Sequence, residues 1–230
     1  MQDHLFSAIV FDFDDTMVYT SPYHYKRYQN SIVHFGFKPE SFDVFYHAMK
    51  TNMGKPWDCI FRTMHPEFKA DNFWPIWDQN KYQLVYDVDL NNALSILSAH
   101  YELGILSATP RNELENHLSC LGIKDLFSII VGRDPDMPKP DPRLALHFTS
   151  QFNLEANKIL YVGDTIVDQK LAHLSGMHFW GIYNDEITKK AFTESTNGLI
   201  GMSSTIYHLL ETLTERAVES KNRLENNVFK

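Results

Sequence analysis

The sequence predicts an α/β fold, in which helices flank a parallel sheet and a helical segment is inserted after the first strand. From about residue 88 onward, short apolar runs rich in β-prone residues alternate with helix-like stretches, which is typical of βαβ units. Between residues 18 and 87 this alternation stops. The length of 230 residues suits one large domain or a core domain with a smaller insert.

The first expected strand is LFSAIVFDF (5–13), which is short, apolar and ends in polar residues. A second strand, YELGILSA (101–108), follows the helical pattern LNNALSILSAH (90–100). From residue 207 onward the chain has the pattern of an amphipathic helix that leads into a charged tail. Further strands are expected at 127–132, 158–164, 178–183 and 198–202.

The segment from 18 to 87 reads as a small domain of its own. Glycines and prolines divide it into short helices, and it holds more than half of the chain's aromatic residues, which indicates packing in a helical core. The sequence therefore predicts a core domain made of residues 1–17 and 88–230, and a helical domain made of residues 18–87.

Composition limits the classes of function. The net charge of -8 argues against a broad basic surface for nucleic acid, although it leaves room for a small anionic substrate. With two cysteines, the fold is not expected to rest on a framework of disulfides. The eleven histidines show no spacing typical of zinc ligands. No apolar run approaches the ~20 residues that span a bilayer, and the first residues lack the basic start of a signal peptide. A cytoplasmic protein is expected.

Polar residues follow several of the predicted strands at the point where each strand ends. The stretch FDFDDTMV (11–18) places three aspartates together, and Ser107 and Asp164 end two other strands. Ligands of parallel sheets bind at the carboxyl ends of the strands, so these side chains are expected to converge. Carboxylates that lie so close together repel one another, so a positively charged group is expected among them.

These stretches carry a resemblance to a known family. FDFDDTMV, LGILSATP, VGRDPDMPKPDP and ILYVGDTIVD resemble, in this order, the four motifs of the haloacid dehalogenase-like hydrolases, and the match runs nearly the whole length. The connector LSCLGIKDLFSIIVGRD is also similar to that of the family. The chain looks most like the subgroup that includes phosphoglycolate phosphatase and β-phosphoglucomutase. This resemblance implies a Rossmann-like doubly wound parallel sheet core with an inserted all-helical cap domain.

The resemblance also implies catalytic roles. Asp12 would be the nucleophile that forms an aspartyl-phosphate, and Asp14 would protonate the leaving alcohol and later activate water. Ser107 would donate a hydrogen bond to the transferred phosphoryl group. Lys139 would pair with Asp12 and the phosphate and so offset the repulsion between the carboxylates.

By the same resemblance the cofactor is Mg²⁺, held by the side chains of Asp12 and Asp164 and by the backbone carbonyl of Asp14. Asp168 would complete this acidic set by orienting Lys139 or a metal-bound water. The residues GDTIVD (163–168) are also typical of a turn that caps a helix.

Four further residues are expected to contact the substrate. Thr16 and Thr109 lie in the first and second motifs, and Pro110, which follows Thr109, is expected to reshape the turn there. His24 lies ten residues after Asp14, and Lys55 lies in NMGKPWDC (52–59), which resembles the substrate-specificity loop of the subgroup.

Two positions depart from the pattern of the family. Asp15 stands where glycine is common, and aspartate tolerates unusual backbone angles, so the departure is expected to be harmless. Trp57 stands where the mutase carries an arginine for a second phosphate, which counts against a bisphosphate intermediate. Asp14 favours phosphoryl transfer over dehalogenation, because the dehalogenases lack a carboxylate there.

The sequence therefore favours a Mg²⁺-dependent phosphatase that acts on a small phosphorylated metabolite, without nucleic acid or membrane partners and as a monomer. Two alternatives stay open. One is a phosphomutase of the β-phosphoglucomutase type, and the other is a catalytically idle binding scaffold on the same fold. The identity of the substrate does not follow from the sequence.

Overall fold

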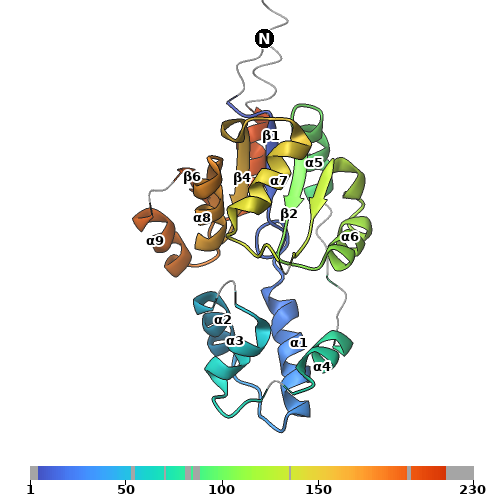
Figure 1. Cartoon of the computed structure of the whole chain (residues 1–230), viewed down its shortest axis with the longest axis vertical. Helices are drawn as coiled ribbons and strands as arrows, with labels where there is room; N and C mark the ends of the chain where they lie inside the picture. The colour runs from blue at the N-terminus through green and yellow to red at the C-terminus, as the bar shows by residue number, and fades with distance from the viewer. Residues whose placement is uncertain are drawn as a thin grey trace, which may run out of the picture. The chain divides into compact units, whose positions relative to one another are not determined.

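The computed structural model of the chain describes residues 5–52, 55–69, 71–80, 84, 89–134, 136–195 and 198–215. The chain divides into two compact units, one made of residues 1–18 and 86–230 and the other of residues 19–85 (Figure 1). The second unit is thus an insertion into the first. Its role as a cap stays a prediction.

The first unit is built on a six-stranded sheet with the order β3-β2-β1-β4-β5-β6, in which every neighbouring pair is parallel. This confirms the predicted α/β fold with a doubly wound parallel sheet. The strands are short, as the apolar runs indicate, and the predicted sixth strand is present. Their bounds are β1 (Ala8–Phe11), β2 (Glu102–Leu106), β3 (Ile129–Val131), β4 (Ile159–Gly163), β5 (His178–Ile182) and β6 (Leu199–Ser203).

Both faces of this sheet are covered. Val10 and Phe179 belong to a buried cluster that also contains residues of the helices α7, α8 and α9. Ile9 and Phe11 alternate with the residues of that cluster along β1, so they point to the opposite face, where they are also buried. Burial on both faces is the reason that the strands read as continuous apolar runs.

The helices of the first unit begin where the sequence offers capping residues. The side chains of Asp141, Thr165 and Asp185 accept hydrogen bonds from the first turns of α7, α8 and α9. Residues 206–215 are helical as well, in line with the predicted amphipathic pattern. The bounds are α5 (Asp89–Ser98), α6 (Arg111–Cys120), α7 (Pro142–Phe152), α8 (Ile166–Ser175) and α9 (Glu186–Glu194), with short 3-10 turns at η1 (Lys124–Leu126) and η2 (Ala156–Lys158).

The second unit is helical throughout its regular elements, which are α1 (Ser21–His34), α2 (Phe42–Thr51), α3 (Trp57–Met64) and α4 (Phe73–Gln79). Its core is aromatic, as the composition of the segment predicts, and Tyr28, Phe45, Phe61 and Trp77 are buried in it. The Tyr28 and Phe45 rings are stacked with their centroids 5.0 Å apart, and Phe45 is also stacked on Trp57 with the two centroids 6.3 Å apart.

Two further sequence expectations concern single segments. Gly54, at the centre of the predicted substrate-specificity loop, lies outside the described residues. Among the described helices, none combines the length and the apolar character needed to cross a membrane.

Candidate active site

The strand order reverses its direction at β1, which lies between β2 and β4. Three chain segments therefore leave the sheet side by side at its carboxyl edge: the one after Phe11, the one after Leu106 and the one after Gly163. These segments carry Asp12 and Asp14, Ser107 and Thr109, and Asp164 and Asp168. The open edge at such a reversal is the usual ligand site of a doubly wound sheet.

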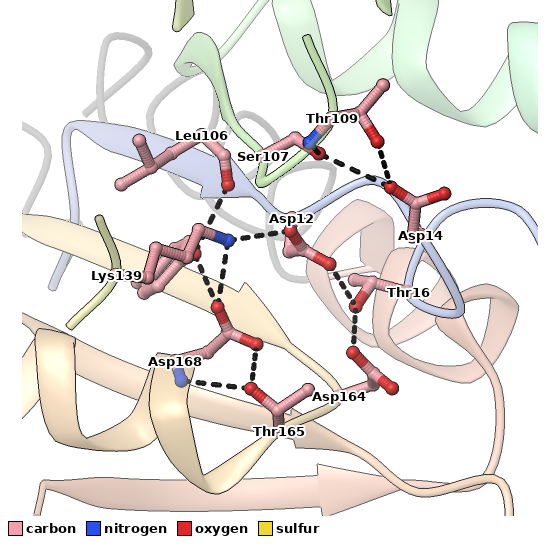
Figure 2. Close-up of polar contacts among 11 residues, drawn as sticks. Asp12, Asp14, Thr16, Leu106, Ser107, Thr109, Lys139, Asp164, Thr165 and Asp168 are labelled. Carbon is pink, nitrogen blue, oxygen red and sulfur yellow. Dashed lines mark hydrogen bonds and ion pairs between the residues drawn. The ribbon is translucent and has the colours of Figure 1, made fainter. Parts of the chain in front are cut away.

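Asp12 and Lys139 form a buried ion pair at the end of β1. The Lys139 ammonium donates to Asp12 Oδ1 at 2.7 Å, and each side chain is only 8% exposed (Figure 2). Burial raises the pKa of Asp12 well above its usual value, and the carboxylates of Asp168, Asp164 and Asp14 raise it further, while Lys139 acts in the opposite direction. Burial alone would lower the pKa of Lys139, but Asp12 and Asp168 raise it above its usual value. The ammonium group is therefore held in its charged form.

Asp168 holds Lys139 from the other side. Its Oδ1 accepts from the Lys139 ammonium at 2.9 Å and from the Tyr161 hydroxyl at 2.8 Å, and its Oδ2 accepts from the Thr165 hydroxyl at 2.5 Å. The Asp168 backbone N–H donates to Thr165 Oγ1, so the cap of α8 also orients the carboxylate. Gly163 leaves space for it, because a Cβ there would lie 2.6 Å from the Asp168 Cβ. The residues GDTIVD therefore cap α8, and two of them, Asp164 and Asp168, also contribute carboxylates to the acidic cluster.

The acidic cluster suits a hard divalent cation. Asp12, Asp164 and Asp168 each offer a carboxylate oxygen within 4.8 Å of the others, and all three residues are buried. Thr16 Oγ1 lies 3.4 Å from both Asp12 Oδ2 and Asp164 Oδ1, which places these two oxygens on the same side of the cluster. Within the described residues, two of these carboxylates pair with the Lys139 ammonium group, and the Asp14 carboxylate lies nearby (Figure 2). An all-oxygen donor set with excess negative charge is what Mg²⁺ and Ca²⁺ bind, so the residues present fit a metal ion.

The Asp14 carboxylate lies apart from this cluster, on the side of the loop after β2. Its Oδ2 accepts hydrogen bonds from the hydroxyl of Thr109 and, at 3.4 Å, from the hydroxyl of Ser107 (Figure 2). Asp15 follows in the left-handed region, with φ at 55°, so aspartate does adopt the backbone angle for which glycine is common. The Asn184 side chain donates to the Asp15 carbonyl at 2.8 Å and anchors this turn.

The first unit thus brings together the residues that the sequence selected at strand ends. These are Asp12, Asp14, Thr16, Ser107, Thr109, Lys139, Asp164 and Asp168. The remaining two, His24 and Lys55, belong to the second unit. There the His24 ring packs 4.9 Å from that of Trp57, and the Lys55 ammonium donates to Asn52 Oδ1 at 3.0 Å.

Sequence reasoning missed two residues that support the site, Tyr161 and Asn184. Tyr161 is fully buried within β4, its hydroxyl donates to Asp168, and its ring centroid lies 5.5 Å from the Lys139 ammonium. A phenol inside an apolar strand was the available signal, because a buried hydroxyl needs a partner. Nothing local in the sequence marks Asn184, since its contact with residue 15 is set by the sheet order.

Comparison with known proteins agrees with this geometry. The sequence profile of the haloacid dehalogenase-like hydrolases matches residues 9–182. A curated protein from Phytophthora nicotianae, an imidazoleglycerol-phosphate dehydratase, is 21% identical over 212 residues, which are 84% of this chain and 47% of that protein. The chain therefore spans about half the length of this relative.

Solved structures show the same fold. A protein from Bacteroides fragilis, assigned as a haloacid dehalogenase-like hydrolase, matches with a TM-score of 0.75 and 23% identity over 89% of this chain and 99% of its own. A phosphoglycolate phosphatase predicted in Haemophilus somnus gives 0.66 and 23% identity over 78% and 86% of the two chains. A protein from Thermotoga maritima, assigned as a β-phosphoglucomutase, gives 0.66 and 20% identity over 91% and 99%. At these identities the likeness concerns the fold.

Proposed function

The chain belongs to the haloacid dehalogenase-like hydrolases, and we propose that it is a Mg²⁺-dependent phosphatase of a small phosphorylated metabolite. One observation carries this proposal. Three buried carboxylates lie together at the carboxyl edge of the sheet, two of them pair with the ammonium group of Lys139, and the half-buried Asp14 lies beside them. Such an excess of buried negative charge costs stability unless a cation offsets it. Charged groups that are kept together despite this loss of stability are expected to take part in catalysis.

The proposed reaction has two steps. In the first, an Asp12 carboxylate oxygen attacks phosphorus, the bond from phosphorus to the leaving oxygen breaks, and the Asp14 carboxyl gives its proton to that oxygen. The products are the free alcohol and an aspartyl-phosphate on Asp12. In the second, water attacks the same phosphorus and loses a proton to Asp14, which releases phosphate and restores both side chains. The Lys139 ammonium donates to the phosphoryl oxygens in both steps, and so does the Ser107 hydroxyl once a phosphoryl oxygen replaces Asp14 Oδ2 as its acceptor.

Mg²⁺ would be held by the carboxylates of Asp12 and Asp164 and by the backbone carbonyl of Asp14. Its contribution when bound is to offset the charge of the phosphate and of the attacking carboxylate. Asp168 already accepts three hydrogen bonds through its side chain, so its part is to keep Lys139 and the acidic cluster in place. Thr16 links Asp12 and Asp164 on the side where the ion would lie.

The second unit is proposed to act as the cap that selects the substrate. It is a compact unit with its own aromatic core, inserted between β1 and β2. His24 and Lys55 are its proposed substrate contacts. If Lys55 binds the substrate, Lys55→Ala raises KM several-fold and leaves the kcat with saturating substrate nearly unchanged. An unchanged KM would remove Lys55 from the binding site.

The phosphatase is preferred over the phosphomutase because of Trp57. Its ring centroid lies 4.6 Å from that of Trp77 and 6.3 Å from that of Phe45, so it takes part in aromatic packing within the second unit. A mutase that keeps a bisphosphate intermediate needs a cation for the second phosphate. Tryptophan supplies none at this position.

The first test is phosphate release from a panel of phosphorylated metabolites, measured with Mg²⁺ and with EDTA. The panel contains phosphoglycolate, sugar phosphates, nucleoside monophosphates and imidazoleglycerol phosphate. The expected result is Mg²⁺-dependent release from at least one compound, abolished in Asp12→Asn. Asp125→Asn, which changes an exposed aspartate in η1, is the matched control and retains activity. Phosphate release that persists in Asp12→Asn would show that Asp12 is not the nucleophile. If the folded, unchanged protein released phosphate from no compound of the panel, the proposed phosphatase activity would be contradicted.

A further inference from the structure

The proposed acid, Asp14, takes its hydrogen bonds from two hydroxyl groups on the loop after β2. Thr109 Oγ1 donates to Asp14 Oδ2, and Ser107 Oγ lies 3.4 Å from the same oxygen. The other Asp14 oxygen is turned away from both hydroxyls (Figure 2). The nucleophile Asp12 is held by different groups, namely the Lys139 ammonium at 2.7 Å and Thr16. The two aspartates of the first motif are thus oriented by separate parts of the chain.

The loop that carries the two hydroxyls is itself fixed. The Ser107 backbone N–H donates to the Val131 carbonyl at 3.0 Å, and the Thr109 backbone N–H donates to Ser107 Oγ at 3.0 Å. The Thr109 carbonyl accepts from the Arg133 backbone N–H at 2.8 Å. These contacts within the chain hold the Thr109 backbone in place, and its hydroxyl then reaches Asp14 Oδ2 without a bound ligand.

Gly132 makes this arrangement possible. A Cβ at residue 132 would lie 2.8 Å from the Thr109 carbonyl oxygen and 2.4 Å from the Arg111 backbone nitrogen. The segment after β3 can approach the loop after β2 only because residue 132 has no side chain. This close approach fixes the loop, and the loop in turn fixes the direction of the Thr109 hydroxyl.

We infer that Thr109 is a positioning residue that aims the Asp14 carboxyl at the leaving oxygen, and is not itself a contact of the phosphoryl group. This inference rests on the proposed phosphatase function. With Oδ2 engaged by the hydroxyl of Thr109, the proton that Asp14 transfers is carried by its other oxygen. A carboxyl group that is held in one orientation transfers this proton without first having to rotate. Thr109 thereby acts on the chemistry through Asp14 and does not touch the substrate.

The test compares two substrates whose leaving groups differ in their need for a proton. An alkyl phosphate, phosphoglycolate or the best alkyl substrate of the panel, needs a proton on its leaving oxygen, whereas p-nitrophenyl phosphate has a leaving group that departs as an anion. Thr109→Val keeps the shape of the side chain and removes the hydroxyl, and Thr109→Ser retains the hydroxyl. The ratio of kcat/KM for the alkyl to that for the aryl phosphate is the readout, because kcat/KM covers the steps up to departure of the leaving group.

In Thr109→Val this ratio is expected to fall roughly tenfold to a hundredfold, which is less than the roughly 10²- to 10⁴-fold that general acid catalysis contributes, because Asp14 itself is retained. Thr109→Ser restores the ratio, and adding Thr109→Val to Asp14→Asn causes no further fall. Equal losses with both substrates would overturn the inference and make Thr109 a phosphate contact. That outcome leaves the proposed function intact, because the function fails if Asp12→Asn stays active or if the unchanged protein releases phosphate from no compound of the panel. Thermal unfolding of each variant separates these results from a loss of folded protein.

Discussion

In the unit with the parallel sheet, three buried carboxylates form a cluster and two of them pair with one ammonium group, whereas in the helical unit a buried guanidinium pairs with one carboxylate. Arg27 lies 4.3 Å above the Trp77 ring, and its guanidinium donates to the Trp77 carbonyl at 2.8 Å and to Asp78 at 3.0 Å. His65 Nε2 lies 2.9 Å from the Tyr28 hydroxyl in the same aromatic core. Both units bury polar groups, but among the described residues of the first unit the carboxylates of the acidic cluster outnumber the ammonium group that contacts them.

This difference separates polar groups that serve the fold from polar groups that serve a ligand. A buried charge with a partner and stacked rings around it needs nothing more, and the helical unit meets this condition at Arg27. The acidic cluster of the sheet unit holds three buried carboxylates and one paired ammonium group, so it is the proposed place of an additional cation. The following predictions test this contrast, starting with the largest expected effect.

Replacing Lys139 by methionine removes the ammonium group that pairs with Asp12 and Asp168. We expect this variant to lose about 3 kcal/mol of unfolding free energy in EDTA, because the carboxylates of Asp12 and Asp168 then stay buried without a cation. Phosphate release is expected to fall at least about a hundredfold. Urea unfolding and the phosphate assay measure the two effects.

The control is Lys189→Met, whose ammonium group lies in an exposed ion pair with Glu186. Its effect on stability is expected to stay below about 1 kcal/mol. If Lys139→Met and the unchanged protein had equal free energies of unfolding, the Lys139 ammonium would not stabilise the buried carboxylates, which would contradict the prediction.

Adding Mg²⁺ is expected to stabilise the sheet unit. At a concentration one hundred times the dissociation constant, the gain in unfolding free energy is about 2.7 kcal/mol, and EDTA removes it. Asp164→Asn should abolish this gain, because it removes one of the carboxylates offered to the ion. Differential scanning calorimetry with and without Mg²⁺ measures it.

The matched variant for the metal prediction is Asp78→Asn, which changes an acidic residue of the helical unit that pairs with Arg27. It should keep the full response to Mg²⁺. A response that survives Asp164→Asn, or one that disappears in Asp78→Asn, would place the cation elsewhere.

Tyr161→Phe tests how the site is supported from within the sheet. The variant loses the hydroxyl that donates to Asp168 at 2.8 Å, and we expect a loss of about 1 kcal/mol in unfolding free energy. Tyr183→Phe, at the end of β5, is the comparison and should cost less. Urea midpoints of both variants decide the point, and an equal cost in the two would show that the Tyr161 hydroxyl contributes nothing specific.

The smallest expected effect concerns pH and the helical unit. Burial lowers the pKa of His65 from 6.5, so the folded unit resists a proton that the unfolded chain accepts. The stability of this unit is therefore complete above the unfolded-state pKa and decreases as pH falls below it. Three of the four tryptophans, Trp57, Trp74 and Trp77, lie in this unit, so tryptophan fluorescence reports on its unfolding.

Thermal unfolding followed by this fluorescence at pH 7.5 and pH 5.5 should give a lower midpoint at the acidic value. His65→Gln, which carries no titratable ring, should reduce the difference between the two midpoints. A larger difference in that variant would contradict the role of His65.

The sequence was sufficient for the sheet and for the residues at its strand ends. Buried parallel strands are visible as short apolar runs, and Asp12, Ser107 and Asp164 each follow such a run directly. Because the carboxyl ends of parallel strands meet at one edge, the approximate place of these side chains follows from topology alone.

The sequence was insufficient for the residues that orient those side chains. Tyr161 is a single residue within an apolar strand, and the contact between its hydroxyl and Asp168 depends on where α8 begins. Thr109 could be placed near the site, but the direction of its hydroxyl depends on the close approach of Gly132, far along the chain. Such contacts are set by tertiary packing, which a local pattern does not contain.

The central place of β1 has a consequence for local opening of the structure. This strand is hydrogen-bonded to β2 on one side and to β4 on the other, and the Asp12 backbone N–H itself donates to the Val162 carbonyl at 2.8 Å. Amides so enclosed exchange with solvent deuterium only when the whole sheet opens, whereas an edge strand such as β6 can detach by itself. Asp12, the proposed nucleophile, is thus expected to be attached to the last part of the chain to lose its order, and fluctuations at the edges of the sheet are expected to leave it in place.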